Sequence, residues 1–292
     1  MPKRSLLFSL CLILCLLIGC ARSSDTPAEP TTPPEADAPS AGETNTSAPT
    51  ENSDSCFMTL RIVSGAETGK LVLAENDEAG AGVYTLSTQS LSRKALPKES
   101  LRDGQLINVY YDSFTEAWPM NFGGVSAIEI VDGAFDNRAA LYLQVLKDLW
   151  EKDSGLNDGV EIIGVDLSQT SLSSAEQSAI AWVFAGDHGT DFVEGSLEEL
   201  IEQEYITAVP ISSTGSGVDL NGPKYYWYHW ENGCLFSITE PPEEIASAYT
   251  LSLFDAQKWR SSMGAYFFSN CWLTPSETGG WIGYDIGAEA IS

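Results

Sequence analysis

Basic residues are scarce in this sequence. Fifteen Lys and Arg stand against 41 Asp and Glu in 292 residues, so the net charge is −26. Such a charge repels polyphosphate backbones and anionic lipid headgroups. We therefore expect no nucleic-acid partner, and any membrane attachment has to come from something other than charge.

Histidine and the common catalytic motifs are also scarce or missing. The chain has two histidines, His188 and His229, and it lacks the G-x-S-x-G, S-x-x-K, H-E-x-x-H and C-x-x-C patterns and a phosphate-binding glycine loop. We therefore predict no catalytic residue, no metal site and no cofactor. An extracytoplasmic hydrolase would have to use His188 or His229, and it remains the alternative to a non-enzymatic protein.

A long hydrophobic run is absent too. The apolar stretch at residues 6–18 follows Lys3 and Arg4 and is shorter than the roughly 20 residues that a membrane span needs. It has the length of a signal-peptide core. The run Leu17-Ile18-Gly19-Cys20 that ends it resembles the lipobox of bacterial lipoproteins.

This resemblance implies a signal peptide over residues 1–19 and a mature chain that begins at Cys20, with palmitate-type acyl chains attached through its thiol. Two or more acyl chains hold a protein stably on a membrane. The predicted location is therefore the outer face of the cytoplasmic membrane, with the body of the protein extracytoplasmic. An ordinary secretory signal with a coincidental cysteine is the alternative.

Residues 20–54 read as a linker. Beyond Cys20 this stretch is Ala, Ser, Thr, Pro and acid, with six prolines and no aromatic or large aliphatic side chain. Nothing in it offsets the entropy of ordering, so it is predicted to be a disordered tether.

Residues 55–135 predict a small all-β barrel. Segments 58–63, 70–73, 83–86, 106–111 and 125–131 are rich in β-branched and aromatic residues, with turn residues between them. The run Ser100-Leu101-Arg102-Asp103-Gly104-Gln105 before segment 106–111, with Trp118-Pro119 and a closing 128–131, resembles the OB-like barrels of some Gram-positive lipoproteins, over residues 57–131. A basic stretch (Arg93, Lys94, Lys98, Arg102) is predicted to be a solvated loop, with contact to an anionic wall polymer as the alternative.

Residues 136–292 predict an α+β domain. Tyr142, Val145, Leu146 and Leu149 repeat at helical spacing, and Ser173 with Glu176 and Ser196 with Glu199 are capping boxes of two further helices. A buried strand is expected at 160–167. Strands are also expected at 225–230 and 234–238, joined in a hairpin by Asn232-Gly233, and at 249–254, 265–273 and 281–286.

The predicted fold class is therefore α+β: a small all-β (OB-like) barrel followed by helices packed on a curved antiparallel sheet. The runs Lys258-Trp259-Arg260-Ser261 and Gly264-Ala265-Tyr266-Phe267-Phe268, with Cys271, Gly280-Trp281, Ile286-Gly287 and Ile291-Ser292, resemble a set of uncharacterised exported Gram-positive proteins. That resemblance implies no activity.

The candidate ligand-binding residues are Lys258, Trp259, Arg260, Trp227 and His229. Lys258 and Arg260 share a strand face beside Trp259 and would recognise a carboxylate or phosphate, unless they form structural ion pairs. Trp227 and His229 belong to the aromatic strip 225–230, which would offer sugars or peptides an exposed face unless both faces are core.

Three other sets of residues have a competing interpretation. Cys234 and Cys271 are predicted to form a disulfide, or else to be buried free thiols. His188 lies between Asp187 and Asp191, which suggests an acid/base or metal site, but a polar turn is favoured because further ligands are missing. Asp153, Asn157 and Asp158 have the composition of a calcium loop without its spacing, which predicts a helix-ending turn.

Taken together, these features predict a lipid-anchored extracytoplasmic lipoprotein that acts as a binding or accessory module. Its partners would be the membrane, through Cys20, and a cell-wall, peptide or protein ligand. A structural or regulatory partner of a membrane complex is the third hypothesis.

Overall fold

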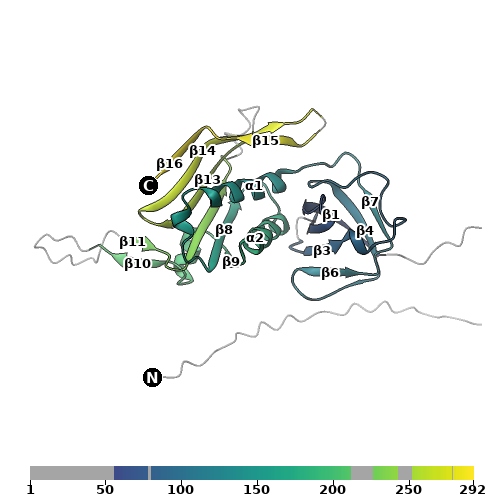
Figure 1. Ribbon diagram of the computed structural model, residues 1–292, viewed down its shortest axis with the longest axis horizontal. Coiled ribbons are helices and arrows are strands. Elements are labelled where there is room, and N and C mark those ends of the chain that lie inside the picture. Colours follow the sequence, from purple (N-terminus) through teal and green to yellow (C-terminus); the bar gives the residue numbers. More distant parts are fainter. Residues whose placement is uncertain (1–55, 78–79, 212–225, 243–251, 278) are drawn as a thin grey trace, which may run out of the picture. The chain divides into compact units, whose positions relative to one another are not determined.

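Two β-sheets and three α-helices make up the described chain (Figure 1). The structure is a computed structural model, and it describes residues 56–77, 80–211, 226–242, 252–277 and 279–292. The predicted signal peptide, the linker and Cys20 lie outside these residues. Residues Asn52–Ser292 form one compact unit.

The first sheet is the curled, all-β part of the fold. Its strands are β1 (Cys56–Ser64), β2 (Lys70–Glu75), β3 (Val83–Ser87), β4 (Leu106–Tyr111), β5 (Ser113–Phe114), β6 (Met120–Gly123) and β7 (Ala127–Ile130), in the order β5-β6-β3-β2-β1-β4-β7. β6 pairs with β3 and β7 pairs with β4, on opposite sides of the sheet. Residues 124–126 join β6 to β7, a span of at most about 14 Å, so the sheet has to curl until β6 approaches β7.

The second sheet contains β8 (Ile162–Gln169), β9 (Asp191–Glu194), β10 (Thr207–Pro210), β11 (Tyr226–His229), β12 (Gly233–Thr239), β13 (Ser252–Ser261), β14 (Gly264–Pro275), β15 (Trp281–Asp285) and β16 (Ala288–Ile291). The main path is β10-β11-β13-β12-β8-β9, and β14 pairs with β13, β15 and β16. The α+β fold class is confirmed. The sheet is mixed, however, because β8 runs parallel to both β12 and β9.

The helices are α1 (Arg138–Glu151), α2 (Ser174–His188) and α3 (Leu197–Glu202). Both predicted capping boxes are confirmed: the Glu176 amide donates to Ser173 and the Glu199 amide donates to Ser196, and each glutamate side chain accepts from the amide of its capping serine. Because α2 connects the parallel strands β8 and β9, it has to lie across one face of the second sheet.

α2 is buried on two sides. One core cluster contains its alanines together with Val72 and Ala74 of β2, while Leu71 and Leu73 of β2 point into the barrel interior. This alternation explains why β2 reads as a continuous apolar run. The barrel and the second sheet share one core through α2, and each fully buried Val or Leu in it contributes about 1.5–3 kcal/mol.

The predicted hairpin at Asn232-Gly233 is wrong. β11 does not pair with β12; both pair antiparallel with β13, through His229 opposite Ser261 and Leu235 opposite Trp259. Glycine is required at position 233 because the Trp230 ring packs directly against it, not because a hairpin turn needs it. A Cβ on Gly233 would lie 1.9 Å from Cε2 of Trp230.

The predicted disulfide between Cys234 and Cys271 is also wrong, and both are buried free thiols. β13 lies between their strands. Cys234 contacts the Trp259 carbonyl oxygen, whereas Cys271 pairs with Phe254, five residues away along β13. At about 3.3 Å per residue the two cysteines are more than about 15 Å apart, well beyond disulfide reach.

Candidate binding surface

Lys258 is fully buried and caps the end of α1. Its Nζ donates to the carbonyl oxygens of Trp150 at 3.1 Å, Lys152 at 2.7 Å and Asp153 at 3.2 Å. Burial lowers the pKa of Lys258, while the three carbonyls favour its charged form. An ammonium has three protons to donate, so Lys258 has none left for a ligand.

Arg260 also donates its hydrogen bonds to backbone carbonyls, here mainly those of the turn that follows α1. Its guanidinium donates to the carbonyl oxygens of Leu156 at 3.0 Å, Asp158 at 2.6 Å and Glu231 at 2.6 Å. The Leu156 and Asp158 carbonyls belong to the predicted helix-ending turn, which contains a short 3-10 helix at Ser154–Asn157, so Arg260 ties this turn to the connection between β11 and β12. Both side chains thus hold backbone carbonyls: Lys258 has no donor left for an anion, and the predicted recognition of an anion by Arg260 stays a prediction.

Trp259 lies on the other face of the sheet. Successive residues of a strand point to opposite faces, so the neighbours of Lys258 and Arg260 turn away from α1. Trp259 packs with the fully buried Trp230 and with Leu200 of α3. The five predicted ligand-binding residues are thus divided between two faces, and they do not form one site.

Trp227 and His229 remain exposed and belong to a two-stranded ribbon. We define the aromatic ribbon as β10 and β11, in which Val209 lies opposite Trp227 and Pro210 lies opposite Tyr226. Trp227 shares a face with His229, and Tyr226 shares the other face with Tyr228, whose ring centroid is 6.3 Å away. Tyr225, the first residue of the predicted strip, lies outside the described residues.

The aromatic ribbon concentrates the exposed apolar surface of the described chain. Of eleven large hydrophobic residues that are exposed there, six lie on the ribbon or next to it: Tyr205, Val209, Ile211, Tyr226, Trp227 and Met263. Val209 is 49% exposed and Trp227 is 37% exposed. Met263 follows Ser262, whose amide and hydroxyl bond to the backbone of Tyr228. Exposed apolar side chains that gather on one element in this way mark a candidate interaction site.

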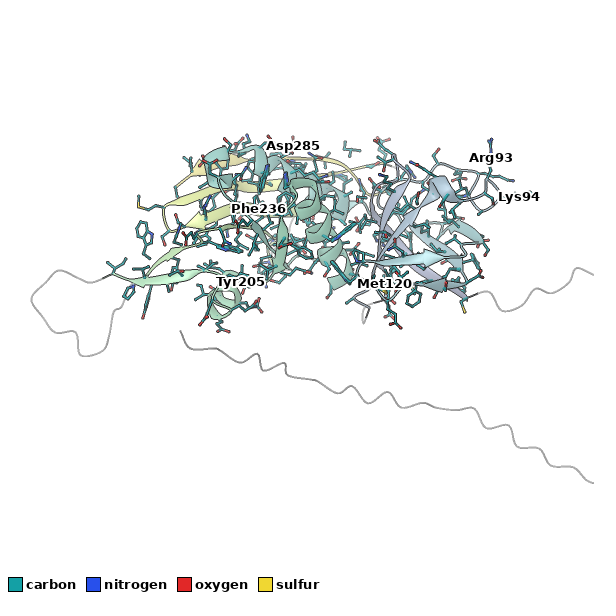
Figure 2. All side chains as sticks on the ribbon, turned by 60° about the horizontal axis from the view of Figure 1, so that its bottom comes forward. Arg93, Lys94, Met120, Tyr205, Phe236 and Asp285 are labelled. Carbon is teal, nitrogen blue, oxygen red and sulfur yellow. The ribbon has the colours of Figure 1, made fainter. Side chains whose placement is uncertain are left out.

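α3 places acidic groups beside the aromatic ribbon. The amides of Tyr205 and Ile206 both donate to the Leu200 carbonyl oxygen, which ties α3 directly to the start of β10. Figure 2 shows Tyr205 at this junction. Four exposed glutamates lie on α3 or directly after it: Glu198, Glu199, Glu202 and Glu204. The ribbon strands themselves contain no Asp, Glu, Lys or Arg, so an uncharged apolar surface lies next to an acidic border.

Neither histidine has a catalytic arrangement among the described residues. His188 is the last residue of α2, and its ring stacks on Trp150 with centroids 3.9 Å apart. Its Nε2 is buried without a hydrogen-bond partner, and burial lowers its pKa. His229 is exposed on β11. In the described ranges no carboxylate or hydroxyl bonds to either ring, and no group of three His, Cys, Asp or Glu side chains is arranged to hold a metal ion.

Comparison with protein-family models, with curated proteins and with solved structures gives no match. The lipobox and exported-protein resemblances therefore stay predictions. Within the part of the chain that the structure describes, no helix has the length and apolar character to cross a membrane.

The sequence pointed to Trp227 and His229 but missed β10. Residues 206–211 read Ile-Thr-Ala-Val-Pro-Ile, a short β-rich run that could have indicated a strand. The basic stretch is exposed as expected, with Arg93 and Lys94 projecting from the barrel loop in Figure 2, and the guanidinium of Arg102 lies 4.8 Å from the centre of the Phe135 ring.

Proposed function

We propose that this protein is a lipid-anchored extracytoplasmic module that captures a cationic, partly apolar polypeptide through the aromatic ribbon. The observation that supports it is the clustering of six of the eleven exposed large hydrophobic residues on or beside one uncharged ribbon, next to the carboxylates of α3. Attachment through Cys20 would hold this surface outside the membrane.

Charge favours a cationic partner. The chain has a net charge of −26, and the carboxylates of α3 lie at the ribbon's border. Complementary charge speeds encounter and rejects partners of the wrong sign. An anionic wall polymer or an anionic lipid surface would be repelled by the same groups.

The backbone of β10 favours a polypeptide over a sugar. β10 ends the strand order of its sheet in the described chain, so its outer edge offers backbone donors and acceptors to another strand. Edge strands are commonly protected by charges or by proline; β10 has no charge, and Pro210 at its end is the residue of this strand that lacks an amide proton. Trp227 and Val209, opposite each other on β11 and β10, would supply the side-chain contacts.

A titration with two synthetic peptides tests this proposal. The first alternates valine and lysine, and the second has glutamate in place of lysine; both carry a fluorophore for anisotropy measurements with the full chain. We expect saturable binding of the lysine peptide that weakens with added salt, and binding of the glutamate peptide weaker by about tenfold or more. Equal binding of the two peptides would contradict the proposal.

A matched pair of variants localises the binding. Val209→Thr with Trp227→Thr removes apolar surface from the ribbon while keeping β-propensity, and Ile282→Thr with Ile291→Thr does the same on the exposed strands β15 and β16. We expect the first pair to weaken binding by about tenfold and the second to leave it unchanged. Ribbon-dependent sedimentation with anionic vesicles would instead identify a membrane surface.

The tether is tested separately. Replacing Cys20 with Ala should release the protein from the membrane fraction, since the remaining chain is strongly anionic. Full retention of this variant at the membrane would contradict lipid anchoring without affecting the peptide titration.

A further inference from the structure

A groove of 690 Å³ lies where the connection between β1 and β2 faces α1 and α2. Leu143, Gln144 and Lys147 form one stripe along α1, and Trp182, Val183 and Gly186 form another along α2. The volume falls within the range of small-molecule sites. The groove is separate from the aromatic ribbon and does not depend on its proposed role.

The base of the groove is apolar. The barrel contributes Val63 and Val72 to the lining of the groove, α1 contributes Leu143, and α2 contributes Trp182 and Val183. Val63, Val72 and Leu143 are largely buried. Trp182 and Val183 are half-buried and pack against the same core. Because Val63 has no exposed surface, Trp182 and Val183 offer the apolar contact that would accept an aliphatic side chain.

The rim contains both signs of charge. Lys147 and Asp187 pair across the two helices at 2.7 Å. Glu67, Lys70 and Asp103 take part in none of the ion pairs found in the described ranges. Asp103 accepts a hydrogen bond from the Ala66 amide at 2.9 Å, yet burial and the charge of Glu67 raise its pKa. A ligand ammonium would stabilise the ionised carboxylate of Asp103, which burial disfavours, and Lys70 would attract an anionic group of the ligand.

We propose that this groove binds a short peptide with free termini. Its ammonium would lie against Glu67 and Asp103, and its carboxylate would face Lys70. An aliphatic side chain would pack on Trp182, and the side chains of Ser64 and Gln144, which also line the groove, would meet the peptide amide. The ligand class follows from unpaired charges of both signs above an apolar base.

Calorimetry with the full chain and alanyl-leucine tests the ligand class. N-acetylation removes the ammonium, amidation removes the carboxylate, and diglycine lacks the aliphatic side chain. We expect saturable binding of alanyl-leucine, and each of the three changes should weaken it by about tenfold or more. No binding at millimolar concentration, or equal binding of all four compounds, would overturn the proposal. Tighter binding of phosphocholine would overturn the assignment to peptides.

A groove-filling variant tests the place. Gly186 lines the groove and a Cβ on it would meet no atom within 4 Å, so Gly186→Leu has room to begin a side chain at the groove wall. Leucine is also a better helix former than glycine, so the variant should fold at least as well. The control is Gly283→Leu on β15, where a Cβ also meets nothing within 4 Å. We expect Gly186→Leu to abolish dipeptide binding and Gly283→Leu to keep it; unchanged binding in Gly186→Leu would overturn the site.

Discussion

Removing the charge of Lys258 should be among the most destabilising single substitutions in the chain. Lys258→Met keeps an unbranched apolar side chain in place and deletes three hydrogen bonds to the carbonyls that end α1. Each charge-assisted bond contributes about 1.5–3 kcal/mol. The Trp150 carbonyl still accepts from the Asn157 side chain and the Asp153 carbonyl from the Leu156 amide, so the Lys152 carbonyl is the one that loses its partner, at a cost of about 1–3 kcal/mol. Relaxation of the structure and entry of water would recover part of this lost free energy.

We therefore expect the free energy of unfolding to fall by about 3–5 kcal/mol, a large fraction of the 5–15 kcal/mol that is typical of folded domains. Urea unfolding followed by tryptophan fluorescence measures it. The control is Lys152→Met, which removes the partly exposed ion pair to Glu289 at 2.9 Å and should cost about 0–1 kcal/mol. A loss for Lys258→Met no larger than that of the control would refute the capping role.

Two further substitutions test the packing around the second sheet. Gly233→Ala should lower the free energy of unfolding by about 1–3 kcal/mol, because its methyl group would overlap Trp230; urea unfolding of Gly283→Ala, where space is open, is the comparison. Burial lowers the pKa of His188, so the unfolded chain binds a proton below about pH 6.5 that the folded protein excludes, and the unfolding free energy should fall as the pH drops below that value. His188→Phe should keep the stacking on Trp150 and flatten this slope; an unchanged slope in urea midpoints against pH would contradict it.

Local signals were read correctly from the sequence. The capping boxes at Ser173 and Ser196 depend on residues three positions apart, and the five barrel strands that were predicted, of seven in the structure, depend on composition over a few residues. These features are set by the backbone near each residue, so tertiary contacts did not need to be known.

The errors concern contacts between distant residues. Lys258 bonds to carbonyls more than one hundred residues away in the sequence, and nothing near Lys258 indicates them. Gly233 was taken for a turn glycine because its role in packing against Trp230 depends on the path of the chain. Whether Cys234 can reach Cys271 depends on the strand order, in which β13 separates their two strands. Local sequence does not reveal that order.

Hydrogen exchange of the full chain with the lysine-containing peptide tests the proposed binding surface most directly. Strand addition at β10 should slow the exchange of those backbone amides among Thr207, Ala208 and Val209 that point away from β11, and the glutamate peptide should leave them unchanged. Protection confined to the barrel, or equal protection by both peptides, would contradict capture of a cationic polypeptide by the aromatic ribbon.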